Sequence, residues 1–156
     1  MTARRIGLIS DTHGLLRASV YSALAGVELI LHAGDVGGDE VLDELALIAP
    51  VRAVRGNTDA LDPRLVEALT ADIDGVRIHV SHGHEVGRVT PAALLAAYPE
   101  DVLVYGHTHR QLVTRADGRL VINPGAAGAR RFDLRPSVGV LTIAARSADV
   151  EIVEIE

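Results

Sequence analysis

Short apolar runs, each followed at once by glycine or polar residues, recur along the chain. The runs have the length and β-branched content of buried strands. They cover residues 5–10, 29–33, 51–55, 76–80 and 102–105. Between the first three runs, apolar residues recur at helical spacing over residues 15–26 and 39–49. Strands that alternate with helices in this way predict an α/β fold with parallel strands.

Glycine, proline and capping residues set the expected helix ends. Gly26 closes the first helix, Asp39 is the predicted N-cap of the second, and Pro50 ends it. A short helix is expected at residues 63–69, because Pro63 fits a first helical turn. A further helix is expected from Thr90-Pro91 to Ala97.

The last third of the chain has a different pattern. Residues 111–115 and 119–122 flank Ala116-Asp117-Gly118, which is a hairpin signal. Residues 136–144 and 149–156 predict two more strands. We therefore expect one α/β domain over residues 1–156, with a second, largely antiparallel sheet.

Polar motifs lie at the downstream ends of the five apolar runs. They are Asp11-Thr12-His13, Gly34-Asp35, Gly56-Asn57, Ser81-His82-Gly83-His84 and Gly106-His107-Thr108-His109. In α/β sheets, ligands bind outside the carboxyl ends of the strands. The five motifs are therefore expected to converge on one rim of the molecule.

Composition narrows the chemistry. The chain has no cysteine and seven histidines, so a metal site would use oxygen and nitrogen donors. The net charge of −6 disfavours stable binding to nucleic acid, although bound cations would still allow an anionic substrate. No apolar run approaches the roughly 20 residues of a membrane span and no signal peptide is visible, so a cytoplasmic protein is expected.

Seven side chains in these motifs are candidate metal ligands. They are Asp11, His13, Asp35, Asn57, His82, His107 and His109. Seven ligands are too many for one ion but suit two ions that share a carboxylate. Two cations roughly 3.5–4 Å apart can hold a hydroxide between them and clamp both oxygens of an in-line phosphoryl displacement. Such a site hydrolyses phosphate esters without a nucleophile from the protein.

Each motif alone has a simpler explanation. Asp11 could be a helix N-cap, Asp35 and Asn57 could be turn residues, and His82 and His84 could be exposed loop histidines. These explanations would have to coincide in all five motifs. The shared metal site accounts for them together.

Taken in order, the motifs resemble the five-part signature of calcineurin-like metallophosphoesterases. The match runs from about residue 5 to Ile122-Asn123-Pro124-Gly125, and Gly56-Asn57-Thr58-Asp59 is most similar to the small bacterial and archaeal phosphodiesterase branch. That branch also includes the retromer scaffold subunit of eukaryotes. The resemblance implies a two-sheet β-sandwich flanked by helices.

The resemblance also implies roles for the seven residues. One ion would be held by Asp11, His13 and His109, the other by Asn57, His82 and His107, with Asp35 bridging. Asn57, His82 and His107 would also help the ions to stabilise the transition state. Two divalent transition-metal ions are expected, with manganese favoured and iron, nickel, cobalt and zinc open; four histidines disfavour magnesium.

One departure from the family pattern bears on the substrate. Many phosphomonoesterases of the superfamily carry a histidine after the asparagine as candidate general acid, and here that residue is Thr58. A threonine hydroxyl is too weak an acid, so a small phosphodiester is expected as substrate, with His84 as an alternative acid. The rival enzyme reading is a phosphomonoesterase.

The rival from another class is a catalytically silent scaffold or binding module of the same fold. A degenerate site should have lost a histidine or carboxylate, and none of the seven is missing. The intact set favours the enzyme. A homo-oligomer is left open, because the apolar C-terminal strands could bury a partner.

Five further features receive weaker assignments. His32 is expected to be a packed histidine that supports Asp35, and His79 a sheet residue without a chemical role. Asp59 either orients a loop or is a turn residue. Asn123-Pro124-Gly125 is expected to be a shaped loop under the site. Arg131, in an arginine-rich segment, is a candidate for binding the substrate phosphate.

Overall fold

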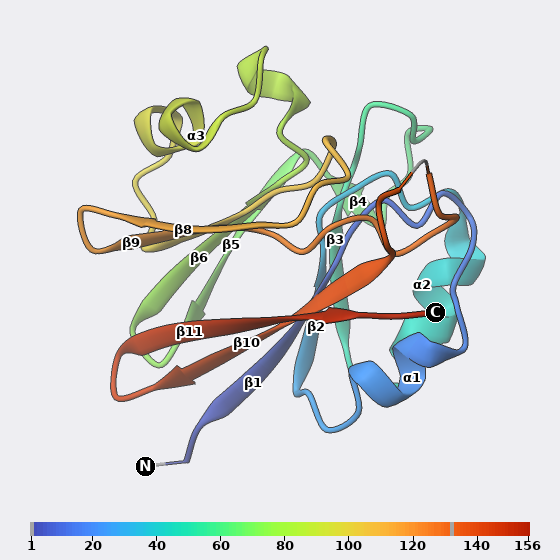
Figure 1. The fold of residues 1–156 in the computed structure, drawn as a ribbon, viewed down its shortest axis with the longest axis horizontal. Helices are drawn as coiled ribbons and strands as arrows, with labels where there is room; N and C mark the ends of the chain where they lie inside the picture. The colour runs from blue at the N-terminus through green and yellow to red at the C-terminus, as the bar shows by residue number, and fades with distance from the viewer. Residues whose placement is uncertain (1, 132) are drawn as a thin grey trace.

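Two β-sheets pack face to face in the computed structural model, which describes residues 2–131 and 133–156 (Figure 1). The first sheet has the strand order β11-β10-β1-β2-β3-β4, and the second has the order β5-β6-β7-β9-β8. The strands of the first sheet are β1 (Arg4–Ile9), β2 (Leu29–His32), β3 (Val51–Val54), β4 (Leu65–Val66), β10 (Ser137–Ala144) and β11 (Ser147–Glu154). Those of the second are β5 (Ala68–Ile73), β6 (Val76–Ser81), β7 (Val102–Val104), β8 (Leu112–Ala116) and β9 (Arg119–Asn123).

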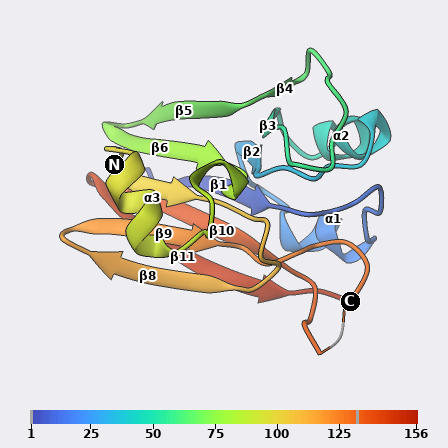
Figure 2. The same ribbon diagram turned by 90° about the horizontal axis from the view of Figure 1, so that it is seen from above.

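Alternation of side chains along the strands builds three apolar layers. Leu8 and Leu31 join the core between the two sheets, whereas their neighbours Ile9 and Ile30 face the opposite side of the first sheet. That outer face packs against α1 (Ser19–Ala23) and α2 (Asp39–Ala46). A third cluster, which includes Leu94 of α3, covers the outside of the second sheet. In Figure 2, which looks from above, α3 (Pro91–Ala97) lies in front of the strands at the left, and α1 and α2 lie at the right.

Three of the four predicted helices form, and the first two of them have corrected ends. The first is only Ser19–Ala23, because the preceding residues form a loop in which Arg17 donates to the Gly128 carbonyl at 2.9 Å. In α2 the N-cap is Gly38, so Asp39 is not the cap but the first helical residue, where its charge favours the helix dipole. Helix α3 begins as predicted: the Thr90 hydroxyl accepts the Ala93 N–H at 3.1 Å.

The helix predicted at residues 63–69 is wrong. Leu65–Val66 pairs in parallel with β3, and Ala68–Ile73 pairs antiparallel with β6. The chain here passes from the edge of one sheet to the edge of the other. The parallel pairing with β3 and the tight β5–β6 hairpin, in which Ile73 faces Val76, outweigh the local preference of a proline-led turn.

The C-terminal strands also differ from prediction, since they do not form a sheet of their own. The β8–β9 hairpin adds to the second sheet through the parallel pairing of β9 with β7. The β10–β11 hairpin adds to the first sheet through the antiparallel pairing of β10 with β1. Both sheets are therefore mixed, and the two-sheet sandwich flanked by helices is confirmed.

This topology brings together the loops that carry the polar motifs. β1, β2 and β3 are parallel in one sheet, and β6 and β7 are parallel in the other. Loops from both sheets meet in direct hydrogen bonds: the His107 N–H donates to the Asp11 carboxylate at 3.1 Å, and His82 Nδ1 donates to the Ala33 carbonyl at 2.8 Å. Within the described ranges, no helix is long and apolar enough to cross a membrane.

Candidate metal centre

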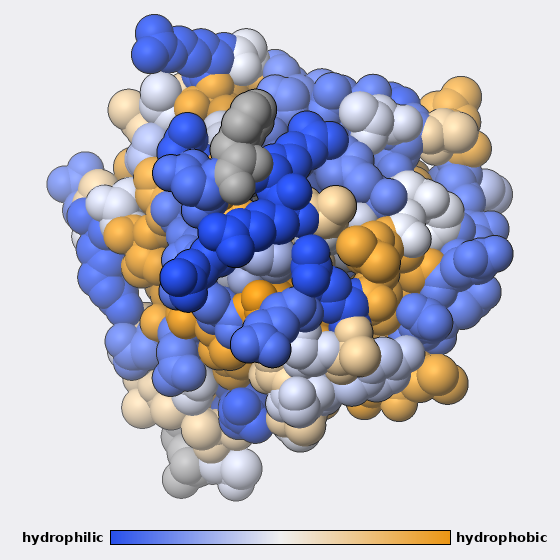
Figure 3. All heavy atoms as spheres, turned by 45° about the vertical axis from the view of Figure 1, so that its right-hand side comes forward, coloured by the Kyte–Doolittle hydropathy of each residue, from blue (hydrophilic) through white to orange (hydrophobic). Residues whose placement is uncertain are grey.

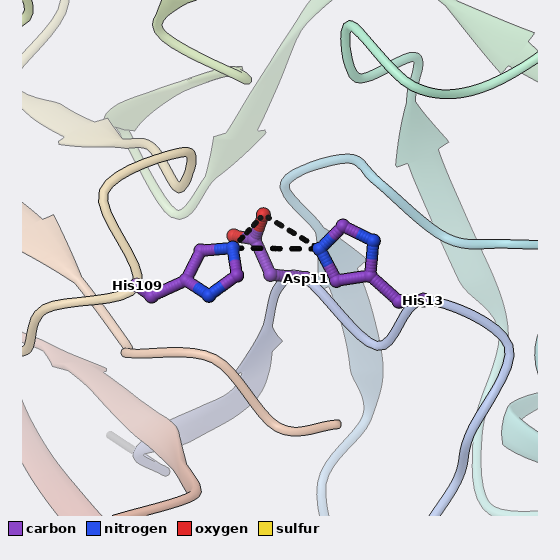
Figure 4. Close-up of side chains that lie close together, drawn as sticks. All are labelled: Asp11, His13 and His109. Carbon is purple, nitrogen blue, oxygen red and sulfur yellow. Dashed lines mark hydrogen bonds and ion pairs between the residues drawn. The ribbon is translucent and has the colours of Figure 1, made fainter. Parts of the chain in front are cut away.

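Asp11, His13 and His109 form the first cluster, which we call the open group. Figure 4 shows the two imidazoles on either side of the Asp11 carboxylate. Asp11 Oδ1 lies 3.7 Å from His13 Nε2 and 3.3 Å from His109 Nε2, and the two Nε2 atoms are 3.4 Å apart. The histidine side chains are 27% and 12% exposed, whereas Asp11 is fully buried. Three donor atoms this close together could hold one metal ion.

Asp11, Asp35 and His82 form the second cluster, which we call the buried group. His82 Nε2 lies 3.3 Å from Asp35 Oδ2 and 3.9 Å from Asp11 Oδ1. His82 Nδ1 donates to the Ala33 carbonyl at 2.8 Å, which leaves the Nε2 lone pair facing the carboxylates. Asp35 Oδ2 is also 3.8 Å from His13 Nε2, so this carboxylate lies between the two groups.

Asn57 and His107 extend the buried group toward solvent. His107 Nδ1 is 3.1 Å from Asn57 Oδ1, and the His107 ring lies 5.1 Å from the His82 ring, edge to face. Asn57 is exposed and His107 is partly buried. All seven predicted ligands therefore belong to one connected set of side chains.

Two atoms of this set are buried without a hydrogen-bond partner. They are Asp11 Oδ1 and His82 Nε2. The other Asp11 oxygen, Oδ2, accepts from Ser10 Oγ at 2.6 Å and from the His107 N–H at 3.1 Å. A buried acceptor without a partner costs about 1–3 kcal/mol. Both orphaned atoms are good ligands for a divalent cation, so the residues present fit a metal ion.

Backbone conformation sets the ligands apart from most of the chain. Among the described residues, nine non-glycine residues have a positive φ, and five of them are predicted ligands. These five are Asp11 (53°), His13 (47°), Asp35 (54°), His107 (69°) and His109 (64°). Each such residue costs of order 1–3 kcal/mol and persists where its surroundings fix it. Such a concentration in one place is typical of a functional site.

Two glycines allow the carboxylates to pack against backbone. A Cβ on Gly56 would overlap the Asp35 carboxylate, and a Cβ on Gly106 would overlap Ser10 and Asp11. Both glycines precede predicted ligands, Asn57 and His107. Their lack of a side chain therefore places ligands from different strands within reach of each other.

Asp59 and His32 hold the loop that carries Asp35. The Asp59 carboxylate accepts from the N–H groups of Val36, Gly37 and Gly56 at 2.9–3.1 Å, so it orients two loops and is not a plain turn residue. His32 is buried, as predicted, and its Nδ1 accepts the Gly34 N–H at 3.1 Å. Its Nε2 then donates to the Thr12 hydroxyl at 3.0 Å, which donates in turn to the Val36 carbonyl.

Two further residues shape the site from below. Asn123 Nδ2 donates to the Gly106 carbonyl and to Thr108 Oγ1, both at 3.0 Å, which supports the loop between the two C-terminal ligands. Ser10 was not singled out from the sequence, although its bond to Asp11 directs the free oxygen inward. The signal available for it was only its place at the end of an apolar run beside an aspartate.

Charge within the cluster shifts several pKa values. Burial alone would raise the pKa of Asp35, but the His82 imidazole 3.3 Å away and hydrogen bonding from Thr58 outweigh it and hold that pKa far below its usual range. Burial alone would lower the pKa of His82, but the Asp35 and Asp11 carboxylates raise it. Burial lowers the pKa of His107, and that of His32 to about 4. The Asp35 carboxyl is therefore ionised, and the raised pKa of His82 means that its imidazole holds a proton more readily than an ordinary histidine does.

The remaining predicted site residues lie at the edge or apart. The His84 ring is 5.4 Å from the His82 ring and 6.2 Å from the His107 ring, and it begins the short 3₁₀ helix η1 (His84–Val86). Arg131 is exposed and forms an isolated bridge with Leu134. Within residues 2–131 and 133–156, no ion pair joins Arg131 to the seven ligands.

Residues 5–146 match the family model of the calcineurin-like phosphoesterase superfamily domain, and this chain belongs to that family. A relative from Methanothermobacter thermautotrophicus, named a probable metallophosphoesterase, is 37% identical over 95% of this chain and 91% of its own length. The phosphodiesterase MJ0936 of Methanocaldococcus jannaschii is 31% identical over 88% of this chain and 92% of its own length.

The fold is also shared with a protein that is not named as a phosphoesterase. The crystal structure of Vps29 from Entamoeba histolytica, complexed with zinc, superposes with a TM-score of 0.76 at 26% identity. The match covers 96% of this chain and 98% of that one. The chain is thus a metallophosphoesterase-family protein with candidate Asp and His ligand groups, and it is similar both to phosphodiesterases and to Vps29.

Proposed function

We propose that this protein is a metal-dependent phosphodiesterase that uses two divalent transition-metal ions, with manganese as the first candidate. The observation that carries the proposal is the pair of buried atoms without a partner, Asp11 Oδ1 and His82 Nε2, inside an otherwise well-bonded cluster. The open group would hold one ion, and His82, His107 and Asn57 the other. Asp35, between them, would be shared.

Two such cations would supply an attacking hydroxide and neutralise the charge that develops on the phosphoryl oxygens. The protein's own part is to fix the ligands. The Ala33 carbonyl sets the tautomer of His82, and the Thr58 N–H holds the Asp35 carboxylate at 3.0 Å. His107 and Asn57, at the solvent side of the cluster, would contact a phosphoryl group and help to stabilise its transition state.

The proposed substrate class follows from Thr58. This residue follows Asn57 at the position where many phosphomonoesterases of the superfamily carry a histidine as candidate general acid, and its hydroxyl is too weak an acid for that role. A diester with a good leaving group needs less help from an acid than a monoester with a poor one. His84, close to His82 and His107, is the residue that would donate a proton if monoesters proved to be substrates.

Hydrolysis of bis(p-nitrophenyl) phosphate, beside the monoester p-nitrophenyl phosphate, tests the proposal. Turnover should vanish after chelation, return with manganese and be faster for the diester. Asp35→Ala should lose at least about a thousand-fold in kcat/KM, since metal ions supply several kcal/mol of transition-state stabilisation. Asp117→Asn, in the exposed β8–β9 turn, is the matched control and should keep wild-type turnover.

The likeness to Vps29 supports a second candidate, a scaffold without turnover. The complete set of seven candidate ligands argues against it, because a site without turnover would not require all of them. A metal-loaded protein that cleaves neither ester, with ions measured in place, would establish the scaffold and reject the enzyme.

A further inference from the structure

A cavity of about 330 Å³ opens between the loop after β2 and the loop after β3. We call it the side pocket; its lining includes Val36, Leu42, Thr58, Leu61, Asp62 and Leu65. Its volume is at the lower end of the range for ligand sites in proteins, about 300–1,000 Å³. Since a cavity of roughly 150 Å³ is enough to hold benzene, the side pocket has room for a substituted aromatic ring.

The side pocket is continuous with the proposed metal centre. Val36 directly follows Asp35, and Thr58 directly follows Asn57. The Thr58 N–H donates to Asp35 Oδ1 at 3.0 Å, so the pocket wall is bonded to a proposed ligand. A phosphoryl group held beside Asp35 and Asn57 would have one of its ester substituents at the mouth of this pocket.

The inner wall of the side pocket is apolar and its rim carries an exposed leucine. Val36 and Leu42 are buried and Leu65 is partly buried, whereas Leu61 is 85% exposed. Figure 3, which brings forward the side that carries α1 and α2, shows apolar patches among hydrophilic ones on this face. A flat ring in the pocket would contact the apolar wall and remove Leu61 from water.

Charge at the mouth limits what can enter. Asp39 and Asp62 both line the pocket, and hydrogen bonding and repulsion from Asp62 raise the pKa of the Asp39 carboxyl. Arg64 is the cation that pairs with Asp39, at 3.8 Å, but it also lies 3.0 Å from Asp43. Its charge is therefore shared between these two carboxylates. Asp59 is already committed to three backbone N–H groups. The mouth therefore repels an added negative charge.

We propose that the side pocket binds one ester substituent of the phosphodiester and selects a single neutral or cationic ring over an anionic one. The inference rests on the phosphodiesterase function proposed above and adds a substrate class to it. Leu61 and the Asp39–Asp62 pair are the specificity-determining residues. The phosphoryl group itself stays with the seven ligands.

Two symmetric diesters test this directly, because either substituent then presents the same ring. Bis(4-carbamoylphenyl) phosphate and bis(4-carboxyphenyl) phosphate are nearly equal in shape and differ in charge. At low ionic strength the wild type should prefer the carbamoyl diester by about five-fold or more in kcat/KM, as expected for exposed charges about 4 Å apart. The Asp39→Asn/Asp62→Asn variant should lose most of this preference, and comparing the same substrate pair cancels their intrinsic reactivities.

Leu61→Ala should lower kcat/KM for both diesters by roughly ten-fold, the effect of removing most of a leucine contact. Leu47→Ala is the matched control, since Leu47 is 79% exposed and lies at the C-terminal end of α2, outside the lining of the side pocket. An independent readout uses metal-free protein: 4-hydroxybenzamide should shift the methyl resonances of Leu61 and Leu65 more than 4-hydroxybenzoate does.

The outcomes separate this inference from the function on which it rests. If diesters are cleaved but the charge preference is the same in the wild type and the double variant, the side pocket does not select the substituent. If no diester is cleaved although the neutral phenol still shifts the leucine methyls, the phosphodiesterase proposal has failed while the pocket still binds its ring.

Discussion

The open group and the buried group share Asp11 but differ in how firmly they are held. In the open group, His13 and His109 are partly exposed and touch mainly each other and Asp11. In the buried group, His82 is fixed by the Ala33 carbonyl and Asp35 by the Thr58 N–H. The buried group is therefore preorganised in the metal-free protein, whereas solvent reaches the two histidines of the open group.

Exchange of one histidine in each group should give the largest contrast. His82→Gln should weaken metal binding by roughly 10³-fold, more than the 10–100-fold that outer-shell changes cause, because no water can replace a fully buried ligand. His13→Gln should cost roughly ten-fold, since water can take its place. Titration calorimetry with manganese checks both, with circular dichroism as the control for folding. Equal losses would mean that burial does not distinguish the groups.

Lowering the pH should destabilise the folded protein through His32, which is fully buried beneath the loop that carries Asp35. Its pKa is about 4 in the folded protein, against the ordinary histidine value of 6.5 once the chain unfolds, so between these values the unfolded chain binds the extra proton. Stability should therefore fall as pH drops from 6.5 to 4, by about 3 kcal/mol from this residue. The raised pKa of His82 matters only above pH 6.5, where its stabilisation is lost as pH rises, and it is constant between pH 6.5 and 4, so it does not mask the effect.

Urea unfolding of the metal-free protein at pH 6.5, 5.5 and 4.5 measures this slope. His32→Gln should be less stable than wild type at pH 6.5 and should show a clearly shallower loss toward acid. A variant slope equal to that of the wild type would show that His32 is not the group that titrates.

A smaller loss than that of His82→Gln is expected for Asp59, which holds only the backbone around the buried group. Asp59→Asn removes an acceptor that three N–H groups share, and it should weaken metal binding by about 10–100-fold. Adding His13→Gln should add its own loss, because Asp59 does not contact the open group. Asp117→Asn serves again as the matched control. A loss that vanishes when His13 is already replaced would contradict the division into two groups.

Sequence alone predicted the five ligand-bearing loops well, because each follows a strand whose apolar run is visible locally. It could not predict the left-handed backbone of Asp11 or His107, since that conformation is imposed by packing against Gly106 and Ser10. It also gave no sign that Asp59 would join two loops. These features depend on contacts between segments far apart in the chain.

The errors in the fold arise from strand pairing at the sheet edges. The turn signal at residues 116–118 specified a hairpin correctly, but a hairpin signal does not say which sheet edge the hairpin joins. The strands at Leu65–Val66 and Ala68–Ile73 exist because β3 and β6 offer free edges, and local propensity at residues 63–69 pointed to a helix. Short segments at sheet edges were therefore the least predictable part of the chain.

The origin of the ligands in both sheets has a mechanical consequence. Asp11 and Asp35 follow strands of one sheet, and His82, His107 and His109 follow strands of the other. Ions bound between them would cross-link the two sheets at one end of the sandwich, where polar loops follow the apolar core. The ions would then have to dissociate before the two sheets could separate. Metal binding would therefore slow unfolding as well as stabilise the folded chain.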